Sequence, residues 1–215
     1  MNDVFVHPSA IVESIQVGGG TRIWAYTHVM SGASIGADCN IGEHCFIESG
    51  VTVGSQVTIK NGNMLWDGVH VEDGVFLGPR VTFTNDLYPR SPRLAQARRR
   101  YADRNWIKPT SVGKGASIGA GAVIVAGICI GEFCTVAAGA TVTRSVPPHA
   151  LVVGAPARVR GWVCECGLPL TFSDGIASCA ECESVFANAG ESVERLAPHA
   201  PPVLTAPTGH SSVSQ

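Results

Sequence analysis

Two polar residues that could do chemistry, Asp67 and Asn85, lie eighteen positions apart in the sequence. A carboxylate can accept a proton from a nucleophile, and an amide can both donate and accept hydrogen bonds. If eighteen residues make one turn of a stacked coil, these two side chains lie on adjacent turns and share one pocket. Aspartate and asparagine are also common at the corners of β-structure, where they bond only the backbone.

A strongly basic segment, residues 84–111, begins beside Asn85. It contains seven basic and two acidic residues, although the whole chain has a net charge of -2. A basic excursion from an otherwise acidic chain indicates an anionic ligand such as a phosphate or pyrophosphate. The alternative is a solvated helix over residues 93–104 whose charges simply face water.

Two pairs of cysteines near the C-terminus have the spacing of metal ligands. Cys164 and Cys166 form a CxC pair, Cys179 and Cys182 form a CxxC pair, and twelve residues separate the pairs. Two such knuckle-like pairs are typical of a structural zinc site with four thiolate ligands. The alternative is a small metal-free hairpin with reduced thiols.

A six-residue repeat defines the elements that must position all these residues. An aliphatic or aromatic residue falls on every sixth position, and an even period keeps these residues on one side of an extended strand. A smaller residue follows four positions after most of them, so short strands joined by tight corners should stack coil upon coil. The sixth-position residues are Phe5, Ile11, Val17, Ile23, Val29, Ile35, Ile41, Ile47, Val53, Ile59, Leu65, Val71, Leu77 and Phe83, and then Val112, Ile118, Ile124, Ile130, Val136 and Val142.

One face of this coil should be unusually apolar on its outside. Residues that flank a sixth-position residue point outward, and on the face of Val29, Ile47 and Leu65 they include large apolar side chains. This pattern predicts a subunit interface around a threefold axis, and the alternative is chance exposure. The outward residues are His28, Met30, Phe46, Met64 and Trp66.

Composition limits the other classes of function. With 215 residues the chain can form one substantial core and a small appendage, and a net charge of -2 argues against nucleic acid as a partner. The N-terminus lacks a secretion signal and no apolar run reaches the length of a membrane span, so we expect a soluble, cytoplasmic protein with reduced thiols. Cys39, Cys45 and Cys134 fall on the small inward positions and should be core residues.

The chain divides into three predicted parts. Residues 1–162 should form the coil, with residues 84–111 as an inserted loop. Residues 163–187 should form the small segment with four cysteines. Residues 188–215 are rich in Ala, Pro, Ser and Thr, so we expect a disordered tail.

Several motifs make the chain resemble a known family. The repeated pattern [Leu/Ile/Val]-Gly-x-x-[small]-x and the stretches VHPSAIVES and DGVFLGPRVTFTNDLYPRS resemble the hexapeptide-repeat acyltransferases. Over residues 5–167 the chain is similar to bacterial nucleotide-sugar N-acetyltransferases, including groups that acetylate UDP-2-acetamido-3-amino-2,3-dideoxyglucuronate or dTDP-3-amino-dideoxyhexoses. The resemblance implies a left-handed parallel β-helix, usually a homotrimer, that binds acetyl-CoA and a nucleotide-linked amino sugar.

The resemblance also implies roles for individual residues. Asn85, in the Phe-Thr-Asn motif, would orient the sugar amine. Separately from the resemblance, we hypothesise that Asp67 accepts the amine proton, and His70 is a further candidate base. An amine with a pKa near 8 is partly neutral already and needs no strong base. Candidates for substrate binding are Asp86, Lys60, Arg80, Tyr88 and Arg90. Candidates for contacts with acetyl-CoA are Lys114, Ala122, Ala138, Arg144, Arg158 and Arg160.

Three other functions are compatible with a coil of this kind. An O-acetyltransferase of a sugar or antibiotic would use the same co-substrate, and a noncatalytic β-helix could serve as a scaffold. A γ-type carbonic anhydrase requires two histidines five residues apart, and no two histidines of this chain have that spacing. The sequence therefore favours acetyl transfer to an amino sugar and excludes the carbonic anhydrase.

Overall fold

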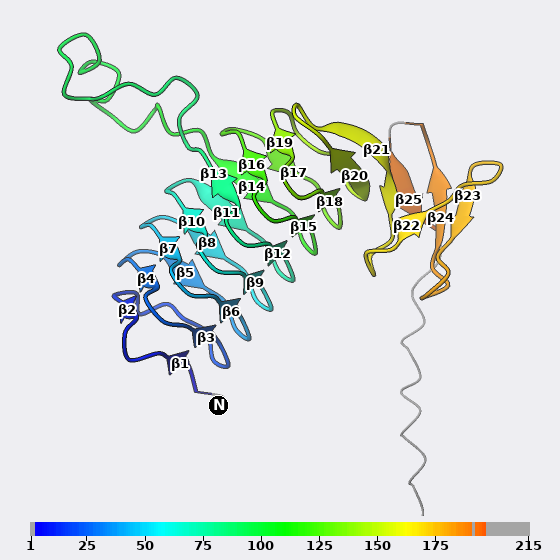
Figure 1. Ribbon diagram of the computed structural model, residues 1–215, viewed down its shortest axis with the longest axis horizontal. Coiled ribbons are helices and arrows are strands. Elements are labelled where there is room, and N and C mark those ends of the chain that lie inside the picture. Colours follow the sequence, from blue (N-terminus) through cyan, green and yellow to red (C-terminus); the bar gives the residue numbers. More distant parts are fainter. Residues whose placement is uncertain (1–2, 191, 197–215) are drawn as a thin grey trace, which may run out of the picture.

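The computed structural model describes residues 3–190 and 192–196, and most of them form a rod of stacked coils (Figure 1). Three parallel sheets run along the rod, and the consecutive strands of one coil belong to different sheets. This arrangement is a parallel β-helix. It confirms the fold that the six-residue period predicts, because each two-residue strand is followed by a corner and then by the next strand.

The strands are short and fall into four sheets. Sheet A contains β1 (Phe5–Val6), β3 (Arg22–Ile23), β6 (Asn40–Ile41), β9 (Thr58–Ile59), β12 (Phe76–Leu77), β15 (Ser117–Ile118), β18 (Thr135–Val136), β20 (Ala150–Val153), β21 (Arg158–Val163) and β22 (Pro169–Leu170). Sheet B contains β2 (Ile11–Val12), β4 (His28–Val29), β7 (Phe46–Ile47), β10 (Met64–Leu65), β13 (Thr82–Phe83), β16 (Val123–Ile124) and β19 (Thr141–Val142). Sheet C contains β5 (Ser34–Ile35), β8 (Thr52–Val53), β11 (Val69–Val71), β14 (Thr110–Val112) and β17 (Cys129–Ile130), and sheet D contains β23 (Ile176–Ser178), β24 (Val185–Asn188) and β25 (Val193–Arg195).

The register between most coils is eighteen residues. It is seventeen at the first coil, where Val6 pairs with Ile23, sixteen at the end, where Val136 pairs with Val152, and longer across the insertion. Leu65 pairs with Ile47, whereas Phe83 pairs with Ile124 across the insertion. The inserted residues 84–109, called the basic loop below, leave the rod between β13 and β14 (Figure 1). They form turns and no helix, so the alternative of a solvated helix is wrong. Sheet B continues past the insertion, which means that the loop extends from one corner without breaking the core.

The core lies inside the coils and consists of the predicted inward residues. From Ile23 onward, every sixth-position residue is at most 4% exposed, and the small-site residues Cys39, Cys45 and Cys134 are buried with them. Burial raises the pKa of Cys134 to about 12, so this thiol stays protonated and acts as a small core side chain. Phe5 and Ile11 are 40% and 57% exposed, contrary to the period, because the first register is one residue shorter: Val6 pairs with Ile23 and Val12 with Val29, which turns Phe5 and Ile11 outward.

Glycines after the inward residues permit the close approach of adjacent coils. A Cβ atom added to Gly36 would lie 2.6 Å from the backbone carbonyl carbon and oxygen of Gly54, one coil further along. Gly36→Ala should therefore destabilise the fold by about 1–3 kcal/mol, since backbone atoms must move to make room. Thermal unfolding followed by circular dichroism measures the effect.

Gly161→Ala provides the matched control for this substitution. No heavy atom lies within 4 Å of the added Cβ at Gly161, which is in β21. The control should unfold close to the temperature of the wild type. Equal unfolding temperatures for the Gly36 and Gly161 variants would contradict the proposed backbone contact.

The rod ends in antiparallel structure that leads into a separate small sheet. β20, β21 and β22 pair antiparallel, and sheet D then forms from β23, β24 and β25. The predicted tail boundary at residue 188 is too early, because β25 pairs with β24 and buries Val193. The rest of the predicted tail, residues 197–215, lies outside the described residues. Nowhere in the described ranges does a helix have the length and apolar character needed to cross a membrane.

Candidate active site

The corner between sheets B and C brings Asp67 and Asn85 together. Asn85 follows β13, and its Nδ2 donates a hydrogen bond of 3.3 Å to the backbone carbonyl oxygen of Asp67, which lies one coil below. The inserted loop returns to the same corner, since the backbone N–H of Lys108 donates to the carbonyl oxygen of Asn85 at 2.9 Å. The eighteen-residue spacing therefore does place the carboxylate and the amide on neighbouring turns.

The carboxylate of Asp67 does not bond the backbone as other corner acids do. Asp73, for comparison, accepts a hydrogen bond of 2.6 Å from the backbone N–H of Ser55 one coil below. Among the described residues, the partner of the Asp67 carboxylate is the guanidinium of Arg104, which comes from the basic loop. The Asp67 carboxylate can therefore bind a cationic group, which argues against a role limited to hydrogen bonding the backbone of the corner.

A second carboxylate, that of Glu48, lies beside Asp67. Its Oε2 accepts a hydrogen bond of 2.8 Å from the backbone N–H of Asp67. Burial raises the pKa of Glu48 above its ordinary value, and the charge of Arg104 opposes part of this shift. The Asp67 side chain is 17% exposed and the Arg104 side chain is 74% exposed, so an exposed cation covers a largely buried acidic corner.

The basic loop is held together by Asp86. Arg100 donates to both carboxylate oxygens of Asp86, and the Tyr101 hydroxyl donates to Oδ2 at 2.7 Å. The hydrogen bonds from Arg100 hold the pKa of Asp86 well below its usual range. Asp86 was predicted to bind substrate, but its two oxygens are committed to the loop itself. Its observed partners indicate a structural role for this carboxylate.

The ion pair of Asp86 and Arg100 predicts an acid-sensitive loop. Because the pKa of Asp86 is lower in the folded chain than in the unfolded chain, the pair stabilises the loop at pH values above about 4. This stabilisation is lost as the pH falls further and the carboxyl becomes protonated. The protection of residues 84–109 against hydrogen exchange, measured relative to the intrinsic rate at each pH, should therefore be lost in acid before that of the coils.

A substitution separates this effect from general acid unfolding. Asp86→Asn should cause the same loss of protection in the loop at neutral pH, because the neutral amide cannot attract the Arg100 guanidinium as the carboxylate does. Asp103→Asn is the matched control, since Asp103 is an exposed loop acid that accepts hydrogen bonds from nearby Asn105. Slow exchange in the Asp86 variant at neutral pH would contradict the assignment.

The other predicted substrate and catalytic residues are spread over different edges of the rod. Tyr88 and Arg90 are exposed in the basic loop. Lys60 and Arg80 are exposed at the corner between sheets A and B. Within one chain they therefore lie at a different corner from Asn85. The remaining candidate, His70, is exposed on β11, where its Nδ1 lies 2.9 Å from Thr52 Oγ1.

The candidate contacts for acetyl-CoA lie on the coils that follow the loop. Ala122 is buried, whereas Ala138 and the cations are exposed. Lys114 is at the corner between sheets C and A, and Arg144 is just after β19. Arg158 and Arg160 belong to β21. These residues do not form one cluster on the described chain.

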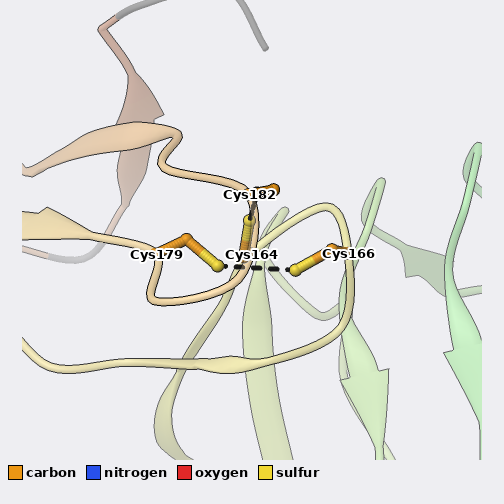
Figure 2. A group of neighbouring side chains, drawn as sticks. All are labelled: Cys164, Cys166, Cys179 and Cys182. Atoms are coloured by element: carbon orange, nitrogen blue, oxygen red, sulfur yellow. Dashed lines mark hydrogen bonds between the residues drawn. The ribbon is translucent and has the colours of Figure 1, made fainter. Parts of the chain in front are cut away.

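The four predicted metal ligands do form one cluster, separate from the corner of Asp67. The sulfur atoms of Cys164, Cys166, Cys179 and Cys182 all lie within 4.8 Å of one another (Figure 2).

Comparison with known proteins assigns the family. A family model described as bacterial transferase hexapeptide (six repeats) matches residues 14–49 and 109–144. The dTDP-3-amino-3,6-dideoxy-alpha-D-galactopyranose 3-N-acetyltransferase of Aneurinibacillus thermoaerophilus is 50% identical over 175 residues, which are 81% of this chain and 86% of that protein. The chain belongs to the bacterial hexapeptide transferases.

More distant proteins match as well. The bifunctional protein GlmU of Alkalilimnicola ehrlichii is 28% identical over 173 residues, and the match spans 74% of this chain but only 35% of that protein. A solved structure of a mutant perosamine N-acetyltransferase from Caulobacter crescentus, in complex with CoA and GDP-perosamine, has 25% identity and a TM-score of 0.41. It covers 74% of this chain and 57% of that one.

This hexapeptide transferase has the predicted apolar stripe on the outer face of sheet B. The ring of Phe46 lies between those of His28 and Trp66, with centroids 5.5 and 5.6 Å away. Met64 is 42% exposed on the same face. The stripe ends at Trp66, next to Asp67, so a partner that covers the stripe would also reach the acidic corner.

Two residues of this hexapeptide transferase site are absent from the sequence-based prediction. Glu48 lies eighteen residues before Trp66, so the same stacking arithmetic that joins Asp67 to Asn85 could have found it. Arg104 comes from the basic loop, which has no repeat to fix its position. Only its membership of a basic segment indicated that it could contact an acidic group.

Proposed function

We propose that this chain transfers the acetyl group of acetyl-CoA to the C3 amino group of a dTDP-linked 3-amino-3,6-dideoxyhexose. The observation that carries the proposal is the 50% identity, over 81% of the chain, to a 3-N-acetyltransferase of such a substrate. The acidic corner of Glu48 and Asp67 supports it, because an amino sugar presents a cation to the enzyme while its nucleotide presents anions to the basic loop.

The proposed reaction is a direct attack of the amine on the thioester. The amine nitrogen forms a bond to the acetyl carbonyl carbon, the carbon–sulfur bond breaks, and the coenzyme A thiolate leaves. A bound ammonium must first lose one proton to solvent, because only the neutral amine has a free lone pair. The second proton leaves the nitrogen after the attack, passes to Asp67 and finally neutralises the thiolate. Arg104, which now pairs with Asp67, must swing away before the ammonium can take its place. Catalysis then rests mainly on holding amine and thioester about 3–3.5 Å apart.

We further propose that the active unit is a homotrimer. Two observations support it: the apolar stripe of sheet B could pack against a second chain, and the candidate residues of one chain lie on several edges that a neighbouring chain could bring together. Sedimentation or light scattering of the purified protein tests this point. We also propose that the enzyme is cytoplasmic, a location in which its eight cysteines would stay reduced.

The experiment for the proposed function is a substrate panel followed by release of free thiol. The panel contains acetyl-CoA with dTDP-linked and UDP-linked sugars that carry an amine at C3, an amine at C4, or only hydroxyl groups. The highest kcat/KM should occur with the dTDP-linked 3-amino sugar, and the product should gain one acetyl group by mass. Faster acetylation of a hydroxyl sugar would favour an O-acetyltransferase. Failure of acetyl-CoA to raise the unfolding temperature would favour a scaffold.

A further inference from the structure

The sulfur atoms of the C-terminal module, residues 163–196, are spaced like the ligands of one metal ion. Cys164 Sγ lies 3.3 Å from Cys182 Sγ, and Cys166 Sγ lies 3.4 Å from Cys179 Sγ (Figure 2). Around a tetrahedral zinc ion with Zn–S bonds of about 2.3 Å, neighbouring sulfurs are roughly 3.8 Å apart. The observed set, with all separations below 4.8 Å, is therefore close to the size of a tetrathiolate shell.

The backbone around the two cysteine pairs has the same shape, although their spacings differ. The N–H of Gly167 donates to the carbonyl oxygen of Cys164 at 2.9 Å, and the N–H of Glu183 donates to that of Cys179 at 3.0 Å. The residue after the second cysteine of each pair has a positive φ, 93° at Gly167 and 59° at Glu183. Glutamate seldom adopts this conformation. Two matching turns that aim their thiols at one point indicate a shared ligand.

The apolar core of the module is too small to explain its fold. It contains six buried residues, and two of these are themselves cysteines of the cluster: Cys164, Leu170, Ala177, Cys179, Phe186 and Val193. Units of fewer than about 40 residues usually need a metal, disulfides or oligomerisation to fold. No disulfide joins any of the described cysteines. A bound metal would provide the missing stabilisation.

We propose that Cys164, Cys166, Cys179 and Cys182 bind one zinc ion as four thiolates, and that this ion folds residues 163–196 onto the end of the coil. Four protein ligands leave no open position, so the site is structural and takes no part in acetyl transfer.

The charge near the cluster suits such a site. Four thiolates and one Zn²⁺ carry a net charge of -2, and the Arg195 guanidinium lies close by. Its Nη2 donates to Ser184 Oγ at 3.3 Å, and this oxygen is 3.4 Å from Cys182 Sγ. Arg195 also pairs with Glu165, at 2.6 Å, and thereby connects β25 to the first cysteine pair. Groups outside the ligand shell commonly orient metal ligands in this way.

The module also packs against the coil, so metal binding affects a cavity that the two parts form together. The ring of His149 packs against Phe133 on the coil and Phe186 in the module, with centroids 5.6 and 5.2 Å away. The turn of residues 164–167 lines a cavity of about 350 Å³ together with Lys114 and Asp73. Zinc binding therefore fixes one wall of a cavity that contains a candidate contact for acetyl-CoA.

The first test is metal analysis of the full-length protein, purified under reducing conditions, beside two variants. The wild type should contain about one zinc ion per chain, and Cys179→Ser should lose it on dialysis. Cys129→Ser is the matched control, because Cys129 is exposed on β17 and lies outside the cluster; it should keep its zinc. Circular dichroism should show that the coil keeps its β signal in all three, since the coil has its own core, whereas Cys179→Ser should lose only the smaller contribution of the module.

A second measurement keeps the proposal testable if the variant folds poorly. Treating the wild type with a zinc chelator should make chymotrypsin cleave after Phe172 and Phe186 at least about tenfold faster, because zinc binding supplies folding free energy to the module. Added Zn²⁺ should restore the protection. The coil should remain intact throughout.

Four results would overturn the proposal. They are reduced thiols that take up no added zinc, a mass lower by four hydrogens that reveals two disulfides, iron in place of zinc, and an equal zinc content in Cys179→Ser and the wild type. Each of these outcomes is independent of acetyl transfer, so loss of activity does not enter the test.

Discussion

Asp67→Asn is expected to lower kcat by roughly 10²–10⁴-fold at neutral pH, the range typical of a lost proton acceptor. The amide has nearly the same shape as the carboxylate, but it cannot take the proton of the sugar ammonium or attract that cation. The affinity for acetyl-CoA should not change, because the Asp67 carboxylate meets Arg104 and not the coils that carry the candidate coenzyme contacts. Thiol release gives kcat, and calorimetric titration gives the affinity.

The pH profile distinguishes a catalytic Asp67 from a merely structural one. Without the carboxylate, the variant depends on the fraction of amine that is already neutral. Below an amine pKa near 8, that fraction rises about tenfold per pH unit, so the activity of the variant should rise more steeply with pH than that of the wild type. Asp103→Asn, the exposed loop acid, is the control. Wild-type turnover in Asp67→Asn would remove this residue from the mechanism.

The repeat made most of the coil predictable from the sequence. Alternation of inward and outward residues fixes which side chain is buried, and the length of eighteen residues that most coils share fixes which side chains stack. This spacing correctly predicts that Asn85 lies one coil above Asp67, and it predicts the apolar stripe from His28 to Trp66. The residues that meet at such a corner can therefore be predicted from the repeat alone, without knowledge of long-range packing.

The basic loop could not be predicted in the same way. Its conformation depends on particular ion pairs, chiefly that of Asp86 with Arg100, and no period indicates which of several arginines meets which acid. For that reason Asp86 was assigned to substrate binding, and the pairing of Arg104 with Asp67 was missed. The strand β25 was missed for a related reason: it is short, and only its pairing with β24 makes it a strand.

Asn85→Ala is expected to lower kcat by about 10²-fold, the cost of a small misplacement of the reacting groups. In the structure, Asn85 Nδ2 donates to the carbonyl oxygen of Asp67, which fixes the orientation of the amide. Its Oδ1 accepts no hydrogen bond from any described residue and can accept one from the sugar amine. That bond would direct the nitrogen lone pair toward the thioester. The alanine variant loses both interactions, so the amine binds beside the carboxylate without the required direction.

The matched control for Asn85→Ala is Asn105→Ala, which removes an exposed asparagine of the same loop. Both variants should retain the wild-type affinity for acetyl-CoA, and only Asn85→Ala should show the lower kcat. Because the role is one of orientation, the pH profile of Asn85→Ala should keep the wild-type shape, unlike that of Asp67→Asn. A raised KM with an unchanged kcat would instead mean that Asn85 contributes only to binding, and the proposed orientation of the amine would be wrong.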